Sequence, residues 1–269
     1  MLDVHRSWAY YRRRPARPRG ARRPEVLAAI QQVVQTRPAT YGYRRVHALL
    51  RRRGVRCNPK TVHALLRRHG WLSSARLACR RPGRRHEGQV AVAEPNRRWA
   101  SDITSLTSWD GLKLRLLVWL DCADRSVLAW RAAPRITAED LCEVLREALW
   151  RRFGGELRRA RGLECLSDNG PEYASQRFRA CVEALGLVAC RTPCRSPQSN
   201  GLAESFFGGF KRDYVWQAVL ETREDILRQL PDWIRDYNEV APHGALGMAA
   251  PAQFYAAWNA KVQDGVVLK

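Results

Sequence analysis

Three acidic residues occupy positions where a carboxylate can take part in chemistry. Asp102 lies in a segment expected to form a strand, Asp168 directly follows the strand expected at 163–167, and Glu204 lies near the start of a helix. Strand ends and helix starts converge at one edge of an α/β sheet, so these carboxylates can meet. Oxygen ligands suit Mg²⁺, and a pair of such ions serves in-line displacement at phosphorus.

Each acid also has an ordinary structural explanation when it is taken alone. Asp102 is compatible with a surface position at a strand end, and Asp168 precedes Asn169-Gly170, a pair typical of turns. Glu204 in a first helical turn is favoured by the helix dipole. The residues by themselves leave both explanations open.

The elements that would position these acids follow from Asn96 onward. Asp110-Gly111 predicts a type I′ hairpin between the first two strands, and Thr137 with Asp140 predicts a capping box. Strands are expected at 97–109, 112–122, 126–132, 163–167 and 187–191, and helices at 137–153, 175–186 and 222–238. This order predicts an α/β fold with a mixed sheet flanked by helices.

Two further acids, Asp121 and Asp124, lie close to the expected sheet and could be taken for metal ligands. The segment 121–125 joins the second and third expected strands, so we interpret both acids as turn residues.

Positive charge is concentrated in the front of the chain. Residues 1–95 contain 23 Lys and Arg against 4 Asp and Glu, whereas residues 96–269 contain 24 against 22. An Arg-heavy composition from a GC-rich genome would load both halves, so the asymmetry favours a polyanion-binding module joined to a second domain.

Three short helices are expected within this basic module. They cover about 24–36, 40–53 and 59–69, and the last has Asn58 as N-cap and Pro59 at its first position. Together they predict an all-α helix-turn-helix-like domain over residues 24–75. Candidate DNA contacts on the last two helices are Arg44, Arg45, Lys60, Thr61, His63, Arg67 and Arg68. The alternative is that these side chains form the solvated faces of a small bundle.

The remaining features indicate a reduced, cytoplasmic protein associated with the nucleoid. Eight cysteines are scattered without a CxxC pair, so zinc is not expected despite His63 and His69, and no other cofactor is indicated. The apolar run near residues 112–130 contains charges, which excludes a membrane span. Residues 76–95 are interpreted as a basic linker, 96–260 as the α/β domain that carries the three acids and 261–269 as a tail.

The motifs around the three acids resemble a known family. Trp99-x-x-Asp102, then "SDNG" at 167–170, then "SPQSNGLAESFFGGFKRDY" from 196, with 35 residues between Asp168 and Glu204, resemble the DDE signature of insertion-sequence transposases. The chain is most similar to the second reading frame of the insertion-sequence-3 family, in its insertion-sequence-2 group. "YGYRRVHALLRRRG", "NPKTVHALLRRHG", "GQVAVAEPNRRWASD" and "YNEVAPHGALGMAAPAQF" extend the resemblance over almost the whole chain.

The resemblance implies a ribonuclease-H-like core, shared with retroviral integrases, that uses two Mg²⁺ or Mn²⁺ ions. Asp102, Asp168 and Glu204 would be the catalytic residues and metal ligands. The chemistry implied is cleavage at the element ends and 3′-OH strand transfer, without a covalent protein intermediate. No Ser, Tyr or Cys lies in a nucleophile–base constellation, in agreement with that chemistry.

One helix would carry both the third acid and a DNA contact. Lys211 lies seven residues after Glu204, about 700° or nearly two full turns, so both share one helix face. Lys211, with the adjacent Arg212, would contact DNA. Gly208 lies on the same face and would let a DNA backbone approach, while Gly208 and Gly209 each cost about 1 kcal/mol relative to Ala in a helix.

The resemblance implies four partners: the element's terminal inverted repeats, target DNA, further copies of the chain, and the product of an upstream reading frame, joined as a frameshift fusion. Residues 1–23 resemble the remnant of an upstream helix-turn-helix, and Ala241 stands where the family commonly has Arg. Two alternatives stay open: a non-catalytic DNA-binding regulator or decayed copy, and a ribonuclease-H-type nuclease.

Overall fold

The computed structural model describes residues 24–37, 39–72, 92–191 and 201–265. These residues fall into two compact units, one within 24–72 and the other within 92–265. The predicted N-terminal segment 1–23, most of the linker expected at 76–95, the loop before the helix of Glu204 and the end of the tail expected at 261–269 lie outside the described residues.

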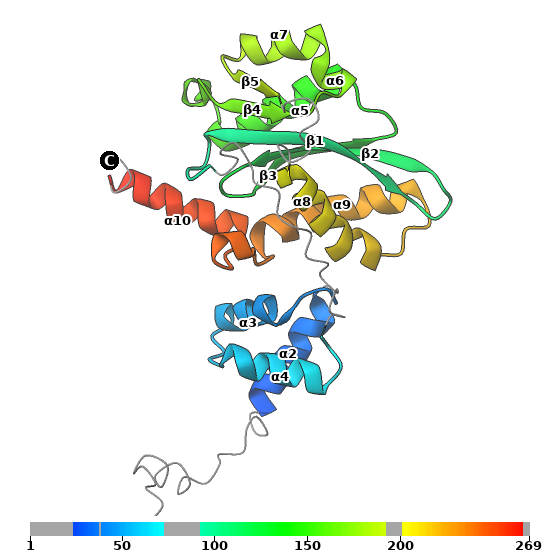
Figure 1. Cartoon of the computed structure of the whole chain (residues 1–269), viewed down its shortest axis with the longest axis vertical. Helices are drawn as coiled ribbons and strands as arrows, with labels where there is room; N and C mark the ends of the chain where they lie inside the picture. The colour runs from blue at the N-terminus through cyan, green and yellow to red at the C-terminus, as the bar shows by residue number, and fades with distance from the viewer. Residues whose placement is uncertain (1–23, 38, 73–91, 192–200, 266–269) are drawn as a thin grey trace, which may run out of the picture. The chain divides into compact units, whose positions relative to one another are not determined.

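The first unit consists of three helices, α2 (Pro24–Thr36), α3 (Tyr43–Arg52) and α4 (Pro59–Arg68), shown in blue to cyan in Figure 1. Each helix turns its apolar stripe inward, and Ile30, Leu50 and Leu66 are fully buried. The expected start of α4 is confirmed, because the Asn58 side chain accepts a hydrogen bond from the Lys60 N–H at 2.8 Å.

The second unit is built on the predicted mixed sheet. Its strands are β1 (Arg98–Thr107), β2 (Lys113–Asp121), β3 (Val127–Ala133), β4 (Glu164–Ser167) and β5 (Val188–Arg191). They lie in the order β3-β2-β1-β4-β5. β1, β2 and β3 are antiparallel neighbours, whereas β4 pairs parallel with β1 and with β5.

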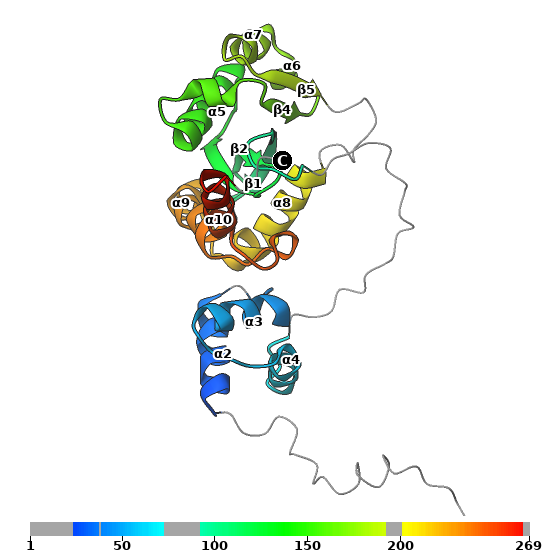
Figure 2. The same ribbon diagram turned by 90° about the vertical axis from the view of Figure 1, so that its left-hand side faces the viewer.

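Helices cover both faces of this sheet. Figures 1 and 2 show α5, α6 and α7 over one face, and α8 and α9 over the other. Their bounds are α5 Ala138–Phe153, α6 Pro171–Ala174, α7 Gln176–Ala184, α8 Gly201–Asp213, α9 Arg223–Glu239 and α10 Pro251–Gln263, with 3₁₀ turns η1 Leu157–Ala160, η3 Val215–Gln217 and η4 Gly244–Leu246. The capping box predicted for Thr137 and Asp140 at the start of α5 is confirmed.

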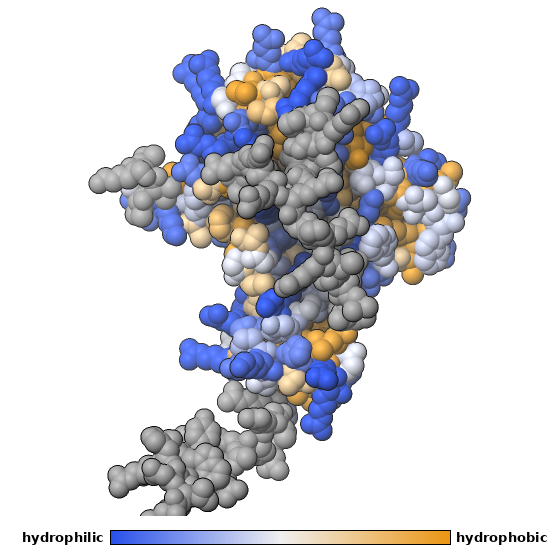
Figure 3. Space-filling model, viewed as in Figure 1, coloured by the Kyte–Doolittle hydropathy of each residue, from blue (hydrophilic) through white to orange (hydrophobic). Residues whose placement is uncertain are grey.

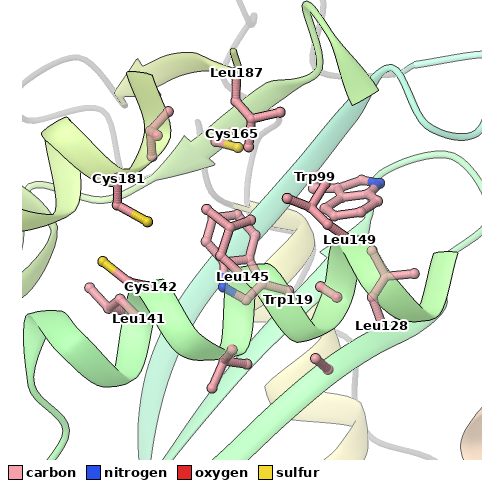
Figure 4. Close-up of a cluster of buried hydrophobic side chains, with 14 of the residues drawn as sticks. Trp99, Trp119, Leu128, Leu141, Cys142, Leu145, Leu149, Cys165, Cys181 and Leu187 are labelled. Carbon is pink, nitrogen blue, oxygen red and sulfur yellow. The ribbon is translucent and has the colours of Figure 1, made fainter. Parts of the chain in front are cut away.

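Strand alternation divides the core of the second unit into two layers. Leu117 and Trp119 of β2 pack into the cluster with α5 and α7, whereas Leu116 and Val118 pack against α8 and α9. Figure 4 shows the first layer, in which Trp99, Trp119 and the leucines of α5 converge. Burial on both faces explains why β2 reads as a continuous apolar run. Within the described residues, no helix is long and apolar enough to cross a membrane.

Cysteines contribute to this packing as reduced thiols. In Figure 4 the sulfurs of Cys142 on α5 and Cys181 on α7 point toward each other across the core layer. The described cysteines are all free. Burial raises the pKa of the Cys142 thiol to about 12, so it packs as a small apolar group.

The connection between β1 and β2 differs from the predicted type I′ hairpin. That turn needs positive φ at both central residues, but Gly111 has φ 81° while Asp110 is not among the residues with positive φ. The Gly111 N–H donates to the Ser108 carbonyl at 3.0 Å, and Asp110 accepts from the Leu112 N–H at 3.0 Å. The connection is therefore longer, and Gly111 takes the left-handed position that follows a tight turn.

The turn interpretation of Asp121 and Asp124 is confirmed. The Asp121 carboxylate accepts hydrogen bonds from the backbone N–H groups of Ala123 at 2.8 Å and Asn96 at 2.7 Å. Both acids are fully buried, and the Arg152 guanidinium lies 2.6 Å from Asp124 and 3.5 Å from Asp121. A buried ion pair thus fixes this turn to α5, a contact that the sequence pattern did not reveal.

Candidate active site

Asp102 lies in the middle of β1 and points to the side of the sheet that α8 covers. Alternation places Asp102 on the same face as Thr104 and Leu106, and Leu106 belongs to the core layer under α8 and α9. The Asp102 Oδ1 accepts a hydrogen bond from the Ile103 N–H at 2.8 Å. This acid is thus held on a rigid element, and much of it is shielded from solvent.

The other two acids come from separate elements. Asp168 directly follows β4, is half-buried, and accepts a hydrogen bond from the Gly170 N–H at 2.9 Å. Glu204 lies in the first turn of α8 and is exposed. Their positions after a strand and at a helix start are those expected from the sequence.

The electrostatic surroundings of Asp102 include both of the other acids. Burial raises the pKa of Asp102 to about 6, and the negative charges of Asp168 and Glu204 add to that rise. The Ile103 hydrogen bond and the positive charge of Lys211 act in the opposite direction. The charge of Asp102 is therefore influenced by two further acids and one base, which come from the segment after β4 and from α8.

The donor chemistry at this point fits a hard divalent cation, because every acidic group offers only carboxylate oxygens. Among the residues that the structure describes, no group of three or more His, Cys, Asp or Glu side chains is gathered tightly enough to hold a metal ion. The acids therefore influence the charge of Asp102, but their side chains do not form a closed metal-binding cluster. An ion held among Asp102, Asp168 and Glu204 would need the exposed Glu204 to complete its shell.

Lys211 is also directed to this part of β1. Its Nζ donates to the Thr104 Oγ1 at 2.7 Å, two residues along β1 from Asp102. Burial lowers the pKa of Lys211, while the charge of Asp102 opposes that shift. Arg212, the neighbouring DNA-contact candidate, instead donates to both carboxylate oxygens of Asp213, at 2.7 and 3.0 Å.

The two glycines of α8 differ in their surroundings. A methyl group built on Gly208 would meet nothing within 4 Å, and the residue is exposed. On Gly209 the same group would make an ordinary contact with Arg212 at 3.7 Å. Packing inside the described part of the chain therefore gives no reason for a glycine at 208.

A hydrogen bond that the sequence did not reveal fixes the Asp168 segment against β1. The Ser101 and Tyr173 hydroxyls lie 2.7 Å apart and are both buried, so α6 is tied to the strand that carries Asp102. Ser101 precedes Asp102 directly, and Tyr173 lies in the helix that follows Asp168. In the sequence, the only sign of this contact is a hydroxyl-bearing residue in each of two segments that lie far apart along the chain.

The DNA-contact candidates of the first unit are placed on the outside of its helices. Lys60, Arg67 and Arg68 are exposed on α4, while Thr61 and His63 are half-buried. The His63 ring packs edge-on against Tyr43, with centroids 5.1 Å apart. On α3, Arg44 and Arg45 lie over tyrosine rings, at 5.4 Å from Tyr43 and 4.8 Å from Tyr41. Hydrophilic residues, drawn blue in Figure 3, project from much of the visible face of this unit.

The mixed five-stranded sheet, helices on both faces and acids on β1, after β4 and on α8 define an integrase-type core of the ribonuclease-H-like class. The families described as Integrase core domain match residues 92–197 and 187–251, and the family described as HTH-like domain matches residues 21–79. A chain in the structure of the simian T-cell lymphotropic virus intasome in complex with PP2A regulatory subunit B56 gamma shares the fold. The TM-score is 0.50 and the identity 20%, over 84% of this chain and 74% of that chain.

Sequence comparison narrows the class to one family. The Escherichia coli transposase InsD for insertion element IS2 is 37% identical over 236 residues, which cover 86% of this chain and 78% of that protein. An insertion element IS136 protein of Agrobacterium fabrum is 41% identical over 179 residues, 66% of this chain and 91% of that protein. The chain belongs to the family of insertion-element transposases of the IS2 InsD type.

Proposed function

We propose that this chain is the catalytic subunit of a DNA transposase, which cuts DNA at the ends of an insertion sequence and joins the freed 3′ ends to target DNA. Asp102, Asp168 and Glu204 would form its DDE triad. The observation that carries the proposal is the Asp102 carboxyl, whose pKa rises to about 6 through burial and through the charges of the other two acids. Two acids from other segments of the chain make ionisation of the buried Asp102 carboxyl unfavourable, and such an arrangement is typical of a functional site.

The triad would bind two Mg²⁺ or Mn²⁺ ions, which supply charge stabilisation at phosphorus and an activated water. In the first reaction, water attacks the phosphodiester and the 3′ oxygen leaves as a free hydroxyl. In the second, that hydroxyl attacks another phosphodiester, so one P–O bond forms and one breaks. Lys211 places a positive charge beside Asp102 and supports an approaching phosphate.

The helix-turn-helix-like unit would recognise the element's terminal inverted repeats. Its exposed Lys60, Arg67 and Arg68 supply the positive charge that phosphate contacts need. Further copies of the chain on the same DNA and the product of an upstream reading frame, joined to this chain by frameshifting, would complete the assembly. Such an assembly acts on DNA in the cytoplasm, at the nucleoid.

The test is metal-dependent cleavage of a duplex that carries the terminal repeats of the flanking DNA. Asp102→Asn, Asp168→Asn and Glu204→Gln should each reduce cleavage by orders of magnitude, because each removes a charged oxygen ligand. Glu224→Gln on the exposed first turn of α9 is the matched control and should leave the rate unchanged. DNA binding without divalent metal should stay within about twofold in all four variants. Cleavage near the wild-type rate in any triad variant contradicts the assignment.

A second candidate function is a DNA-binding regulator that occupies element ends without cutting them. The observation that favours it is the separate compact unit of residues 24–72, which has its own buried core and needs no catalytic group. Strand-transfer assays with the purified chain, with and without the upstream product, separate the two functions. A parallel assay on an RNA–DNA hybrid tests the ribonuclease-H-type alternative, which would prefer the hybrid to duplex DNA.

A further inference from the structure

A cavity of about 540 Å³ lies at the end of the sheet where β1 and β4 begin. Its walls come from the segment before β1, from the connection between η1 and β4, and from α10, and they include Asn96, Arg97, Arg161 and Trp258. Asp102 lies five residues along β1 from Arg97, roughly 16 Å at the usual rise per strand residue. Asp168 lies beyond the opposite end of β4. The cavity is therefore separate from the acidic site.

Positive charge dominates the rim of this cavity. Arg97, Arg159 and Arg161 line it together with a single acid, Glu94. Arg97 lies 3.1 Å from Glu94 and Arg159 lies 3.4 Å from Glu156, with arginine side chains 73% and 56% exposed. Ion pairs this exposed contribute little to stability, so the guanidinium groups can turn to a phosphate at small cost.

An aromatic residue of α10, Trp258, lines the side of the cavity that α10 forms, next to Tyr255 of the same helix. Trp258 stacks on Tyr255, with ring centroids 5.8 Å apart and planes inclined by 28°. The Arg152 guanidinium lies 3.8 Å from the centre of the Tyr255 ring and pairs with the buried Asp124 at 2.6 Å. The tryptophan is thus the outer member of a column that begins at a buried ion pair. Such a fixed ring can stack with a nucleobase at little loss of conformational entropy.

Two lining residues carry buried polar atoms, the Asn96 Oδ1 and the Trp258 Nε1, which have no hydrogen-bond partner within the described residues and are covered by the protein. The groups that a ligand can reach are therefore the exposed arginines and the half-buried ring of Trp258. A simple anion needs only the arginines, whereas a nucleotide combines a phosphate with a base that stacks on an aromatic ring. The lining therefore matches a ligand that combines a phosphate with a base.

We propose that this cavity binds one unpaired nucleotide of a DNA strand, with its phosphate on the arginines and its base against Trp258. The proposal rests on the proposed function only in taking DNA as the substrate. A base inside a duplex exposes neither its ring face nor its pairing edge, so the ligand is single-stranded. The cavity is a second contact for the strand whose phosphodiester lies at the acids.

The test is photocrosslinking of a single-stranded thymidine 12-mer, in which 5-iododeoxyuridine replaces thymidine, to the full chain carrying Asp102→Asn without divalent metal. Mass spectrometry should place the main adduct on Trp258. Trp109, Trp150 and Trp216 are internal controls, because they are 66%, 66% and 63% exposed and report non-specific capture. Adducts on these three without one on Trp258 overturn the proposal.

Two further sets of measurements, on arginine variants and with competing strands, test whether the ligand needs both a phosphate and a base. Arg97→Gln with Arg161→Gln should lower the Trp258 adduct about tenfold, since two charge-assisted contacts are lost. Arg158→Gln, on the 3₁₀ turn η1 directly before Arg161 but outside the cavity lining, should change the adduct less than about twofold. An unmodified thymidine 12-mer should compete, and an abasic 12-mer should not. Equal effects of the arginine variants, or equal competition by the abasic strand, contradict a nucleotide site.

The same chain keeps this result apart from the proposed function. Loss of cleavage in Asp102→Asn reports on the triad alone, and the adduct in that variant reports on the cavity alone. Thermal unfolding of each arginine variant should match the parent chain, because the substituted side chains are exposed.

Discussion

At the scale of single residues, Asp102 is held in a state that costs stability at neutral pH. Its pKa of about 6 lies above the ordinary value of 3.8, chiefly because burial disfavours the charged form and two acids add repulsion. The folded chain therefore binds this proton more tightly than the unfolded chain does. The free energy of unfolding falls as pH rises from about 4 to about 6, and the full cost is present above that range.

This cost predicts that Asp102→Asn stabilises the chain at neutral pH. The amide removes the buried charge, so the free energy of unfolding at pH 7.5 should rise by about 1–3 kcal/mol. The gain should vanish near pH 4, where the wild-type carboxyl is protonated in the folded state. Unfolding midpoints of both chains between pH 4 and 8 provide the check. A gain that does not depend on pH would show that ionisation of Asp102 is not its source.

The same acid predicts that metal and protons compete. A ligand carboxylate must be ionised, so the stabilisation of the chain by Mn²⁺ should decline as pH falls through about 6. The measurement is the metal-induced rise in unfolding midpoint at pH 7.5 and at pH 5. Asp102→Asn should show little rise at either pH, and a rise equal to that of the wild type would exclude Asp102 as a ligand.

At the scale of elements, α8 carries Glu204, Lys211 and the glycine pair Gly208-Gly209 within its 13 residues. Its buried side, formed by Ala203, Phe206 and Phe210, fixes the helix against β2 and α9, and Glu204 is thereby placed at β1. Gly208 contributes nothing to that packing. A helix that accepts such a destabilising residue without a packing reason points to an external partner.

We therefore predict that Gly208→Ala separates stability from function. Alanine should stabilise α8 by up to about 1 kcal/mol, because it has the higher helix propensity and its methyl group meets nothing within 4 Å. DNA cleavage should nevertheless fall several-fold if a DNA backbone approaches that face. Gly209→Ala is the matched control and should stabilise without a loss of cleavage. Unchanged cleavage in Gly208→Ala would show that DNA does not pass there.

Local signals made most of these elements predictable. The Asn58 cap and the Thr137 capping box are encoded within a few residues, and both are confirmed. The hairpin after β1 was misassigned because Asp-Gly suits more than one turn, and the choice depends on the backbone of Asp110. Helix α10 ends at Gln263 and runs across the domain boundary expected at residue 260.

Contacts between distant segments were not predictable from one sequence. Ser101 and Tyr173 are 72 residues apart, and no local pattern indicates that their hydroxyls meet. The buried pair of Arg152 with Asp124 is of the same kind. The three acids were recognised from their motifs and spacing, whereas the electrostatic state of Asp102 required the sheet and α8 together.

At the scale of the whole molecule, charge is divided between the two parts of the chain. Residues 1–95 contain 23 Lys and Arg against 4 Asp and Glu, and the remainder is nearly balanced. Binding that depends on phosphate contacts weakens steeply with salt, since counterions are released from the DNA. We expect DNA affinity to be determined mainly by the front of the chain.

This division predicts the salt dependence of DNA binding. Arg67→Gln and Arg68→Gln should each reduce the slope of log K against log salt by about 0.9 and weaken binding to all sequences alike. Arg228→Gln on α9, whose side chain is 74% exposed, should leave the slope unchanged. Equal slopes in all three variants would place the phosphate contacts elsewhere on the chain.

The distribution of the acids over β1, the end of β4 and α8 also sets an order in time. The ribosome releases Asp102 first, Asp168 66 residues later and Glu204 36 residues after that. At about 5–20 residues per second, roughly 5 to 20 seconds separate the first acid from the last. The antiparallel half of the sheet can form while the rest is still being made. The antiparallel half of the sheet can therefore be in place before Glu204, the last of the three acids, has left the ribosome, so the acidic site is completed only after much of the domain has folded.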